Sequence, residues 1–311
     1  MEKEQNFVSV VVYVYNAERR LEHFLTQIID VLENNFAHSE IICVNDASSD
    51  QSIDVIKRVC HNTTTVSVSV VNMSHFHGLE LSMKAGVDLS IGDYVFEFDN
   101  TFLNFDQMVI IQVYKQLLEG YDIVSASPDT DERLTSKLFY RVFDYYSDRQ
   151  YKLTTESFRV LSRRAINRIG SMTKSVPYRK VVYANVGLKT DNIKYTPKEK
   201  NLCNYDKKER TFRTGLAIDS LILFTDMGYS FSKTMTAIMM IVSLFMVMYS
   251  LIVYFTSNPV AGWTTTVLFL SVAFFGLFGI LTVIIKYLQL LVDLVFKRKN
   301  YTYEGIEKIT N

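Results

Sequence analysis

The chain has 311 residues, and its 33 basic and 33 acidic side chains leave no formal net charge. A protein whose main partner is nucleic acid normally carries a basic excess, so this balance excludes that class. The hydrophobic content of 48% excludes a disordered chain. Three cysteines without a paired spacing exclude a disulfide framework or a zinc site and favour a body in a reducing, cytoplasmic environment.

Strand-like and helix-like patterns alternate along the N-terminal part of the chain. Residues 7–14 form a β-branched run typical of a buried strand, and apolar residues within 17–34 recur at the spacing of one helix face. The same reasoning predicts strands at 41–45, 66–71, 94–98 and 122–126 and helices at 49–60, 79–89 and 106–119. This order predicts an α/β fold with a mostly parallel sheet covered on both faces. Ligands of such sheets bind beyond the carboxyl ends of the strands, here at Tyr15-Asn16, Asn45-Asp46 and Asp99-Asn100.

From Met235 to Ile285 the sequence contains no Asp, Glu, Lys or Arg. Turn-forming residues around Pro259 divide this run into two stretches, 235–256 and 264–285, of 22 residues each. A helix of that length crosses the hydrocarbon core of a bilayer, which is about 30 Å thick. The sequence therefore predicts two transmembrane helices, and the alternative is a buried helical hairpin in a soluble protein.

Charges beside the two stretches predict their orientation. Lys233 precedes the first stretch and basic residues 297–299 follow the second, whereas the connecting loop is uncharged. By the positive-inside rule, the main domain and both termini lie in the cytoplasm, and the N-terminus lacks the apolar core of a signal peptide. We therefore expect an integral membrane protein with a cytoplasmic domain at 1–211, juxtamembrane interfacial helices at 212–234, the two spans, and a cytoplasmic tail at 286–311.

Three motifs at the expected strand ends resemble those of family 2 glycosyltransferases with the GT-A fold. They are VVYVYNAERRL (residues 11–21), CVNDASSDQS (43–52) and GDYVFEFDN (92–100). These motifs, followed by the two predicted spans, make residues 7–299 similar to the polyprenyl-phosphate branch of this family. The resemblance implies a Rossmann-like GT-A domain. It also implies inverting transfer of a sugar from a nucleotide-diphospho-sugar to a polyprenyl phosphate at the cytoplasmic membrane face.

The resemblance assigns nucleotide binding to the first two motifs. The acid after the second strand, here Asp46, accepts a hydrogen bond from the base in that family, and Tyr13, Tyr15 and Asn16 would line the same pocket. A carboxylate at the carboxyl end of a strand suits this role, and the alternative is a helix cap. The sequence departs from the family pattern at Tyr13, usually proline, and at Ala17, usually glutamate.

The third motif corresponds to the DxD sequence, whose carboxylates hold Mg²⁺ or Mn²⁺ on the donor diphosphate. Here it reads Asp99-Asn100-Thr101, so a hydroxyl replaces the second carboxylate and weakens the expectation of a metal. The resemblance implies that Asp99 is a catalytic, nucleotide-binding and metal-ligating residue, because Mg²⁺ often takes only one or two protein carboxylates. Glu97 shares the strand face of Asp99 but lies one step too early for the usual ligand. A capping role for Asp99 stays open.

A fourth stretch, residues 156–160, resembles a family strand in which an acid two residues before an arginine assists transfer. Arg159 is present, but Ser157 replaces the acid and Glu156 stands beside it. Serine needs help to act as a general base at neutral pH. Strand alternation turns Glu156 to the opposite face unless a bulge intervenes. Glu156 and Arg159 are the catalytic candidates here.

Basic side chains gather where the expected juxtamembrane helices begin. The resemblance implies that they hold a donor or acceptor phosphate near the membrane, a role that both Arg and Lys suit. The candidates are Lys207, Lys208, Arg210 and Arg213. The alternative is a solvated loop attracted to anionic lipid headgroups.

More than one class of function fits this sequence. The first is a hexosyl-transferring enzyme whose partners are a nucleotide-diphospho-sugar, a polyprenyl phosphate and membrane lipid. The second is a divergent family member that binds a nucleotide sugar or a partner protein without transfer, since function resides in the site rather than the fold. A transferase with another acceptor and a homo-oligomeric state both stay open.

Overall fold

The structure is a computed structural model. It describes residues 3–129 except 62 and 64, then 141, 143, 155–172, 178–185, 187–198, 211–212, 214–216, 218 and 303–308, with scattered helical positions between 234 and 291. The chain forms two compact units. The first comprises Met1–Arg141, Arg149–Leu216 and Lys299–Asn311, and the second comprises Val142–Asp148 and Ala217–Arg298.

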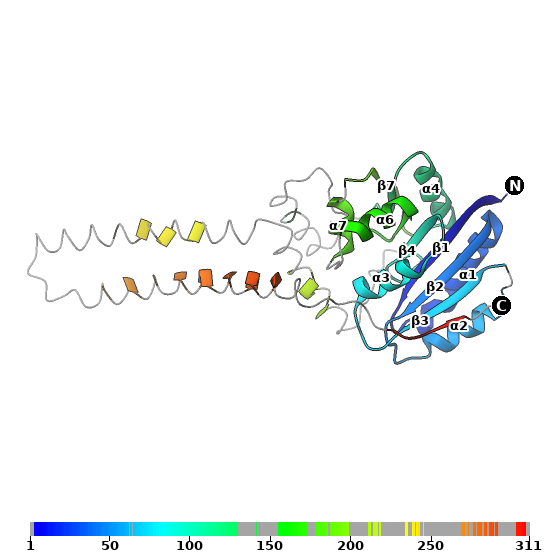
Figure 1. Ribbon diagram of the computed structural model, residues 1–311, viewed down its shortest axis with the longest axis horizontal. Helices are drawn as coiled ribbons and strands as arrows, with labels where there is room; N and C mark the ends of the chain where they lie inside the picture. Colours follow the sequence, from blue (N-terminus) through cyan, green and yellow to red (C-terminus); the bar gives the residue numbers. More distant parts are fainter. Residues whose placement is uncertain are drawn as a thin grey trace, which may run out of the picture. The chain divides into compact units, whose positions relative to one another are not determined.

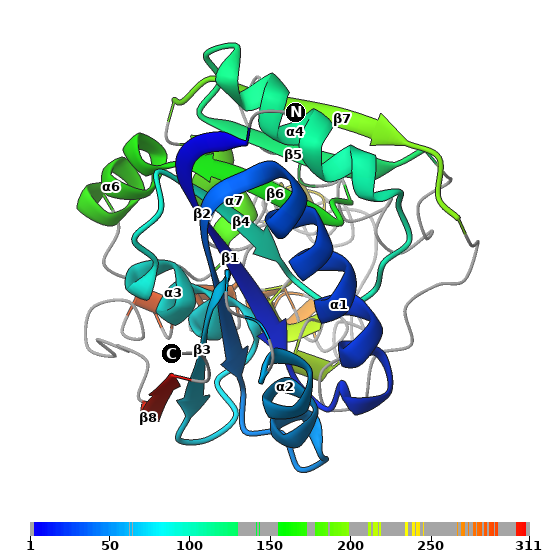
Figure 2. The same cartoon turned by 90° about the vertical axis from the view of Figure 1, so that its right-hand side faces the viewer.

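The described part of the first unit is built on an eight-stranded sheet in the order β7-β5-β6-β4-β1-β2-β3-β8 (Figures 1 and 2). β1 pairs in parallel with β2 and β4, β2 with β3, and β5 with β7. β6 runs antiparallel to β4 and β5, and β8 runs antiparallel to β3. The strands are β1 (Glu4–Val14), β2 (Phe36–Asn45), β3 (Ser67–Met73), β4 (Tyr94–Phe98), β5 (Ile123–Pro128), β6 (Phe158–Ser162), β7 (Thr190–Tyr195) and β8 (Tyr303–Lys308).

Helices cover both faces of the sheet, because its central strands carry apolar side chains on both sides. The helices are α1 (Glu18–Asn35), α2 (Ser52–Cys60), α3 (Leu79–Leu89), α4 (Gln107–Leu118), α6 (Arg163–Met172) and α7 (Arg179–Asn185). α1, α2 and α4 share one core with the even-numbered valines of β1. α3 packs with Val11 and Tyr13 on the opposite face.

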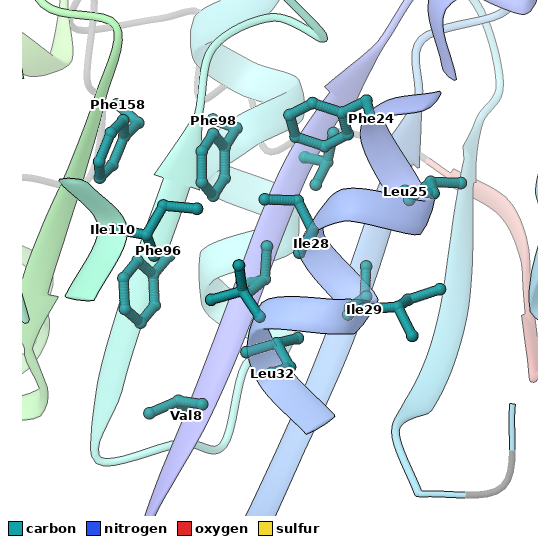
Figure 3. Packing of buried hydrophobic residues seen from close by; sticks show 14 of the residues in the cluster. Val8, Phe24, Leu25, Ile28, Ile29, Leu32, Phe96, Phe98, Ile110 and Phe158 are labelled. Carbon is teal, nitrogen blue, oxygen red and sulfur yellow. The ribbon is translucent and has the colours of Figure 1, made fainter. Parts of the chain in front are cut away.

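Aromatic and branched side chains fill the larger core between α1 and the sheet (Figure 3). Phe24 of α1 meets Phe98 of β4 edge to face, with ring centroids 5.3 Å apart. Phe98 in turn stacks on Phe158 of β6 at 5.1 Å. Because truncating a buried phenylalanine costs about 3–5 kcal/mol, this layer holds the carboxyl end of β4 firmly in place.

The predicted α/β fold is confirmed, and the strand at 94–98 and the helix at 79–89 have the predicted bounds. β2 differs, since it begins at Phe36 rather than at residue 41. The physical reason is that α1 ends at Asn35 and passes into β2 without an intervening loop. Within the tail expected at 286–311, residues 303–308 form β8, which pairs with Ser69–Met73 of β3 in the first unit.

The described helical positions of the second unit expose large apolar side chains. Phe245, Leu277 and Leu288 have 66, 53 and 56% of their surface exposed. Two segments of this unit approach closely, because a Cβ added to Gly276 would lie 2.7 Å from the sulfur of Met239. Among the described residues, none of the helices is long and apolar enough to cross a bilayer. Most of the predicted spans at 235–256 and 264–285 lie outside those residues.

Candidate functional site

Three parallel strands end side by side at one edge of the sheet. β1 lies between β2 and β4, and it runs parallel to both. Asp46 directly follows β2 and Asp99 directly follows β4, so the two carboxylates flank the end of β1. Tyr15 and Asn16 begin the loop that leaves β1 at the same edge. The sequence therefore located the strand ends correctly.

Asp46 is fully buried and hydrogen-bonded by protein groups. The Tyr13 hydroxyl donates to Oδ2 over 3.0 Å. The backbone N–H of His77 donates to Oδ1 over 2.7 Å, and that of Gly78 donates to Oδ2 over 2.8 Å. The structure thus brings Tyr13 and Asp46 together and gives Asp46 the task of fixing the loop before α3. Its role in base binding stays a prediction.

Aromatic rings pack against one another next to the Asp46 carboxylate. The rings of Tyr15 and Phe76 lie 4.8 Å apart, and those of Phe76 and Phe212 lie 5.7 Å apart. Gly78 has a φ of +82°, and a Cβ there would collide with the Phe212 ring at 2.2 Å. The backbone conformation favours glycine at this position, and any other residue would also have to displace the Phe212 ring.

Asn16 ties the loop after β1 to the loop after β2. Its φ is +46°, a left-handed conformation that asparagine tolerates better than most residues. Its Oδ1 accepts the backbone N–H of Ser49 over 2.9 Å, and its own N–H donates to the Ser48 hydroxyl over 3.1 Å. Asn16 thus shapes the edge near Asp46, and its contact with a nucleotide stays a prediction.

Asp99 is held between two buried arginines. Arg159 Nη2 donates to its Oδ2 over 2.7 Å, and Arg179 Nη2 donates to its Oδ1 over 2.6 Å. Glu97 binds the same two arginines through Oε2, over 3.0 Å from Arg159 Nη1 and 2.7 Å from Arg179 Nη1. The Tyr183 hydroxyl donates to Glu97 Oε1 over 2.7 Å. These five residues, with Glu80 and Glu156, form what we call the arginine cluster.

Strand geometry explains half of the arginine cluster. Side chains two residues apart along a strand share a face, so Glu97 and Asp99 point to the same side of β4. In the antiparallel pair of β4 and β6, Glu97 lies directly opposite Arg159, which places the guanidinium between the two acids. Arg179 and Tyr183 come from α7, far along the chain.

Charge pairing sets the ionisation of this cluster. Burial alone would raise the pKa of Asp99, but Arg159 and Arg179 outweigh it and hold that pKa well below its usual range. Burial would likewise lower the pKa of each arginine, and the surrounding carboxylates raise it instead. Burial, together with Glu97, raises the pKa of Tyr183, which stays a neutral donor. Formally, the carboxylates of Glu80, Glu97, Asp99 and Glu156 exceed the two guanidinium charges by two, and Lys180, which also lowers the pKa of Asp99, reduces this excess to one.

Glu156 reaches the arginine cluster, contrary to the alternation argument. Its Oε2 accepts from Arg159 Nε over 3.0 Å. Glu156 lies before β6 begins at Phe158, so the side-chain alternation of a strand does not apply and no bulge is needed. Ser157, the residue at the family's acid position, instead shares a hydrogen bond with the Tyr195 hydroxyl.

Asp99 is the candidate ligand for a divalent metal. Among the described residues there is no group of three or more His, Cys, Asp or Glu side chains that could hold one. Each oxygen of Asp99 accepts one guanidinium donor and keeps a second lone pair, and the surplus negative charge favours a cation. The residues thus fit a metal held by Asp99 and by ligand oxygens, and this role stays a prediction. Lys207, Lys208, Arg210 and Arg213 lie outside the described residues.

Sequence reasoning missed Arg179, Tyr183 and Glu80. Glu80 accepts from both the backbone N–H and Nε of Arg179, over 3.0 and 2.9 Å, and so joins α3 to α7. No local pattern marks these residues, because α7 is short and its partners lie 80 or more positions away. The sequence did contain one sign of them. Acids stand in apolar surroundings at positions 80 and 97, and a buried acid requires a buried cation as its partner.

An open, mostly parallel sheet with charged residues at the carboxyl ends of its strands defines a Rossmann-like class, in which ligands bind at that edge of the sheet. The family model of Glycosyl transferase family 2 matches residues 9–171, more than half of the chain. This chain therefore belongs to glycosyl transferase family 2, and the resemblance seen in the sequence is confirmed.

Several relatives are glycosyltransferases by name. An uncharacterized glycosyltransferase of Synechocystis sp. is 29% identical over 186 residues, 58% of each chain. The uncharacterized glycosyltransferase YkcC of Bacillus subtilis is 23% identical over 96% of this chain and 94% of its own length. The "Prophage bactoprenol glucosyl transferase homolog" of Escherichia coli is 28% identical over 62% of this chain and 64% of its own length. The chain thus matches less than two thirds of the length of the first and third relatives.

A solved structure supports the fold. The mannosyltransferase PcManGT of Pyrobaculum calidifontis, in complex with GDP-Man and Mn²⁺, superposes with a TM-score of 0.52 at 15% sequence identity. The match covers 70% of this chain and 63% of that one. The likeness shows the fold, and the predicted GT-A type of α/β domain is confirmed.

Proposed function

We propose that this protein transfers a sugar, with inversion, from a nucleotide-diphospho-sugar to a polyprenyl phosphate at the cytoplasmic face of a membrane. The observation that carries the proposal is Asp99, ionised at the carboxyl end of β4 in the arginine cluster. That edge is where ligands bind in sheets of this kind. The bactoprenol relative supports a polyprenyl-phosphate acceptor.

The residues of the chain act mainly by binding and orientation. Arg159 and Arg179 keep Asp99 ionised and fix both of its oxygens. A Mg²⁺ or Mn²⁺ ion at Asp99, completed by diphosphate oxygens, would stabilise the charge of the leaving nucleotide diphosphate. The acceptor phosphate is already ionised and needs little help from a base, so Ser157 at the family's acid position is compatible with transfer.

We also propose that residues 235–256 and 264–285 span the membrane and that both termini are cytoplasmic. The exposed apolar side chains of the second unit support this proposal, because such surfaces are unfavourable in water. The return of β8 to the sheet of the first unit supports an even number of crossings between β7 and β8. Single-cysteine labelling with an impermeant reagent in intact cells tests the orientation. Labelling at position 258 and protection at position 311 are expected, and the reverse pattern would contradict it.

A turnover assay tests the transfer. Purified full-length protein in detergent or nanodiscs is incubated with polyprenyl phosphate and a panel of radiolabelled nucleotide sugars, with Mn²⁺ or with chelator. The expected product is a lipid-linked sugar formed by the parent protein and lost in Asp99→Asn. No product with any donor would defeat the proposal.

A second candidate function is nucleotide-sugar binding without transfer, as a partner subunit. Two observations favour it: the second DxD acid is Thr101, and Asp46 is already occupied by protein donors. Nucleotide titration with Mn²⁺ and with chelator separates the two. A transferase with a metal at Asp99 should bind metal and nucleotide with positive coupling, whereas a binder without transfer should bind nucleotide equally under both conditions.

A further inference from the structure

Glu97 is an unusual residue for the interior of a buried strand. It lies in β4 with no exposed surface, and a buried carboxylate is costly unless it is paired and hydrogen-bonded. Both of its oxygens are used: Oε2 is shared by Arg159 and Arg179, and Oε1 accepts from Tyr183. Through these hydrogen bonds, Glu97 links strand β6 to helix α7.

The two arginines connect Glu97 to Asp99. Each guanidinium places Nη1 on Glu97 and Nη2 on Asp99, so each bridges the two acids like a rigid fork. The two guanidinium groups donate to different oxygens of Asp99 but to the same oxygen of Glu97. Consequently the orientation of the Asp99 carboxylate follows from the position of Glu97.

Exposure separates the inner acid from the outer one. The Glu97 side chain is fully buried, whereas the Asp99 side chain keeps 10% of its surface exposed. Glu97 cannot touch a ligand at the sheet edge, and Asp99 can. If the cluster served stability alone, apolar residues of similar volume would serve as well or better.

We infer that Glu97 is a positioning residue for the sugar transfer proposed above: acting through Arg159 and Arg179, it sets the orientation of the Asp99 carboxylate toward the metal-bound nucleotide diphosphate. This inference rests on the proposed function. It also gives the acid at position 97 a task distinct from metal ligation, at a site where Thr101 supplies no second carboxylate.

The main test is Glu97→Gln in the full-length protein. The substitution keeps the shape of the side chain but removes the charge that both guanidinium groups share. Mn²⁺ affinity is measured by electron paramagnetic resonance in the presence of UDP and, separately, GDP. Since loss of a partner that orients a metal ligand typically costs about 10- to 100-fold in affinity or activity, we expect a loss of that size. In turnover, kcat should fall by a similar factor while KM for the lipid stays within about twofold.

Asp122→Asn is the matched control. Asp122 is also a buried carboxylate with several donors, among them Arg164 Nε at 2.7 Å and Ser162 Oγ at 3.3 Å. It precedes β5 and pairs with the far end of β6, away from Asp99. Both variants should lower the thermal unfolding midpoint, but only Glu97→Gln should weaken Mn²⁺–nucleotide binding. Equal binding by both variants and the parent would overturn the inference.

Tyr183→Phe keeps the inference testable if Glu97→Gln does not fold. It removes one hydrogen bond to Glu97 and leaves every charge in place. A loss of about two- to fivefold in Mn²⁺–nucleotide affinity is expected, smaller than for Glu97→Gln, because one hydrogen bond to the carboxylate is lost while every charge remains. Unchanged affinity would contradict the inference. A parent that binds Mn²⁺ with neither nucleotide would overturn it as well, whereas binding without turnover would defeat only the proposed transfer.

Discussion

Asp46 and Asp99 occupy equivalent places, each directly after a parallel strand at the same edge of the sheet, yet different partners satisfy them. Asp46 accepts from neutral donors, a hydroxyl and two backbone N–H groups, and is fully buried. Asp99 accepts from two guanidinium groups and keeps some exposure. The first carboxylate fixes a loop, and the second belongs to a charged cluster with a surplus of acid. Position at a strand end therefore finds a site residue, but its partners decide what it does.

The largest expected effect comes from Asp99→Asn. Removing this charge takes away the acid that faces a ligand, so kcat should fall by about 10²–10³-fold. Asp93→Asn is the matched control, because Asp93 precedes β4 as Asp99 follows it, and its Oδ2 accepts from the backbone of Phe7. Turnover of the lipid-linked sugar is the measurement. Equal activities of the two variants would remove Asp99 from the site.

Asp46→Ala should have the next largest effect. It removes the predicted bond to the base and leaves the N–H groups of His77 and Gly78 without their acceptor, so nucleotide affinity should fall by about 1.5–3 kcal/mol. Calorimetry measures the affinity, and hydrogen exchange measures the two amides. Faster exchange with unchanged affinity would mean that Asp46 is a loop anchor alone, which sharpens the contrast with Asp99.

Thr101→Asp should strengthen metal binding. It restores the family's second carboxylate, and the added charge should tighten Mn²⁺ binding with UDP or GDP about tenfold, or about 1.4 kcal/mol. Asn100→Asp is the control, because it adds the same charge at the neighbouring position, where the side chain accepts from Phe102 N–H. Equal gains from both variants would point to general electrostatics rather than to a ligand at position 101.

The smallest effect concerns acid unfolding. The pKa of Asp99 lies below its unfolded value, so its ionised form stabilises the fold above the unfolded pKa, and this contribution fades as pH falls below about 4. Urea unfolding at pH 7 and in steps below pH 4 should show a loss of stability that is smaller in Asp99→Asn. An identical acid loss in parent and variant would mean that the arginines do not stabilise the charged form.

The sequence was sufficient for the strand ends, because strand-like runs such as residues 7–14 and 94–98, rich in branched and aromatic residues, are followed by polar residues. It also placed Glu97 correctly as an inner neighbour of Asp99, since alternation along a strand is a local rule. Glu156 was misjudged for the same reason, because the rule was applied to a residue that precedes the strand. The role of Arg179 could not be predicted from the sequence, because only the packing of α7 against the sheet brings its partners to it.

β8 has a practical consequence for anyone who wishes to work with the first unit alone. A fragment that stops at Leu216 would lack residues 303–308 and would leave the backbone groups of Ser69–Met73 without their antiparallel partner. Open strand edges recruit other chains and promote aggregation. A shorter protein should therefore rejoin the C-terminal strand through a flexible linker, and an affinity tag is better placed at the N-terminus than directly after β8.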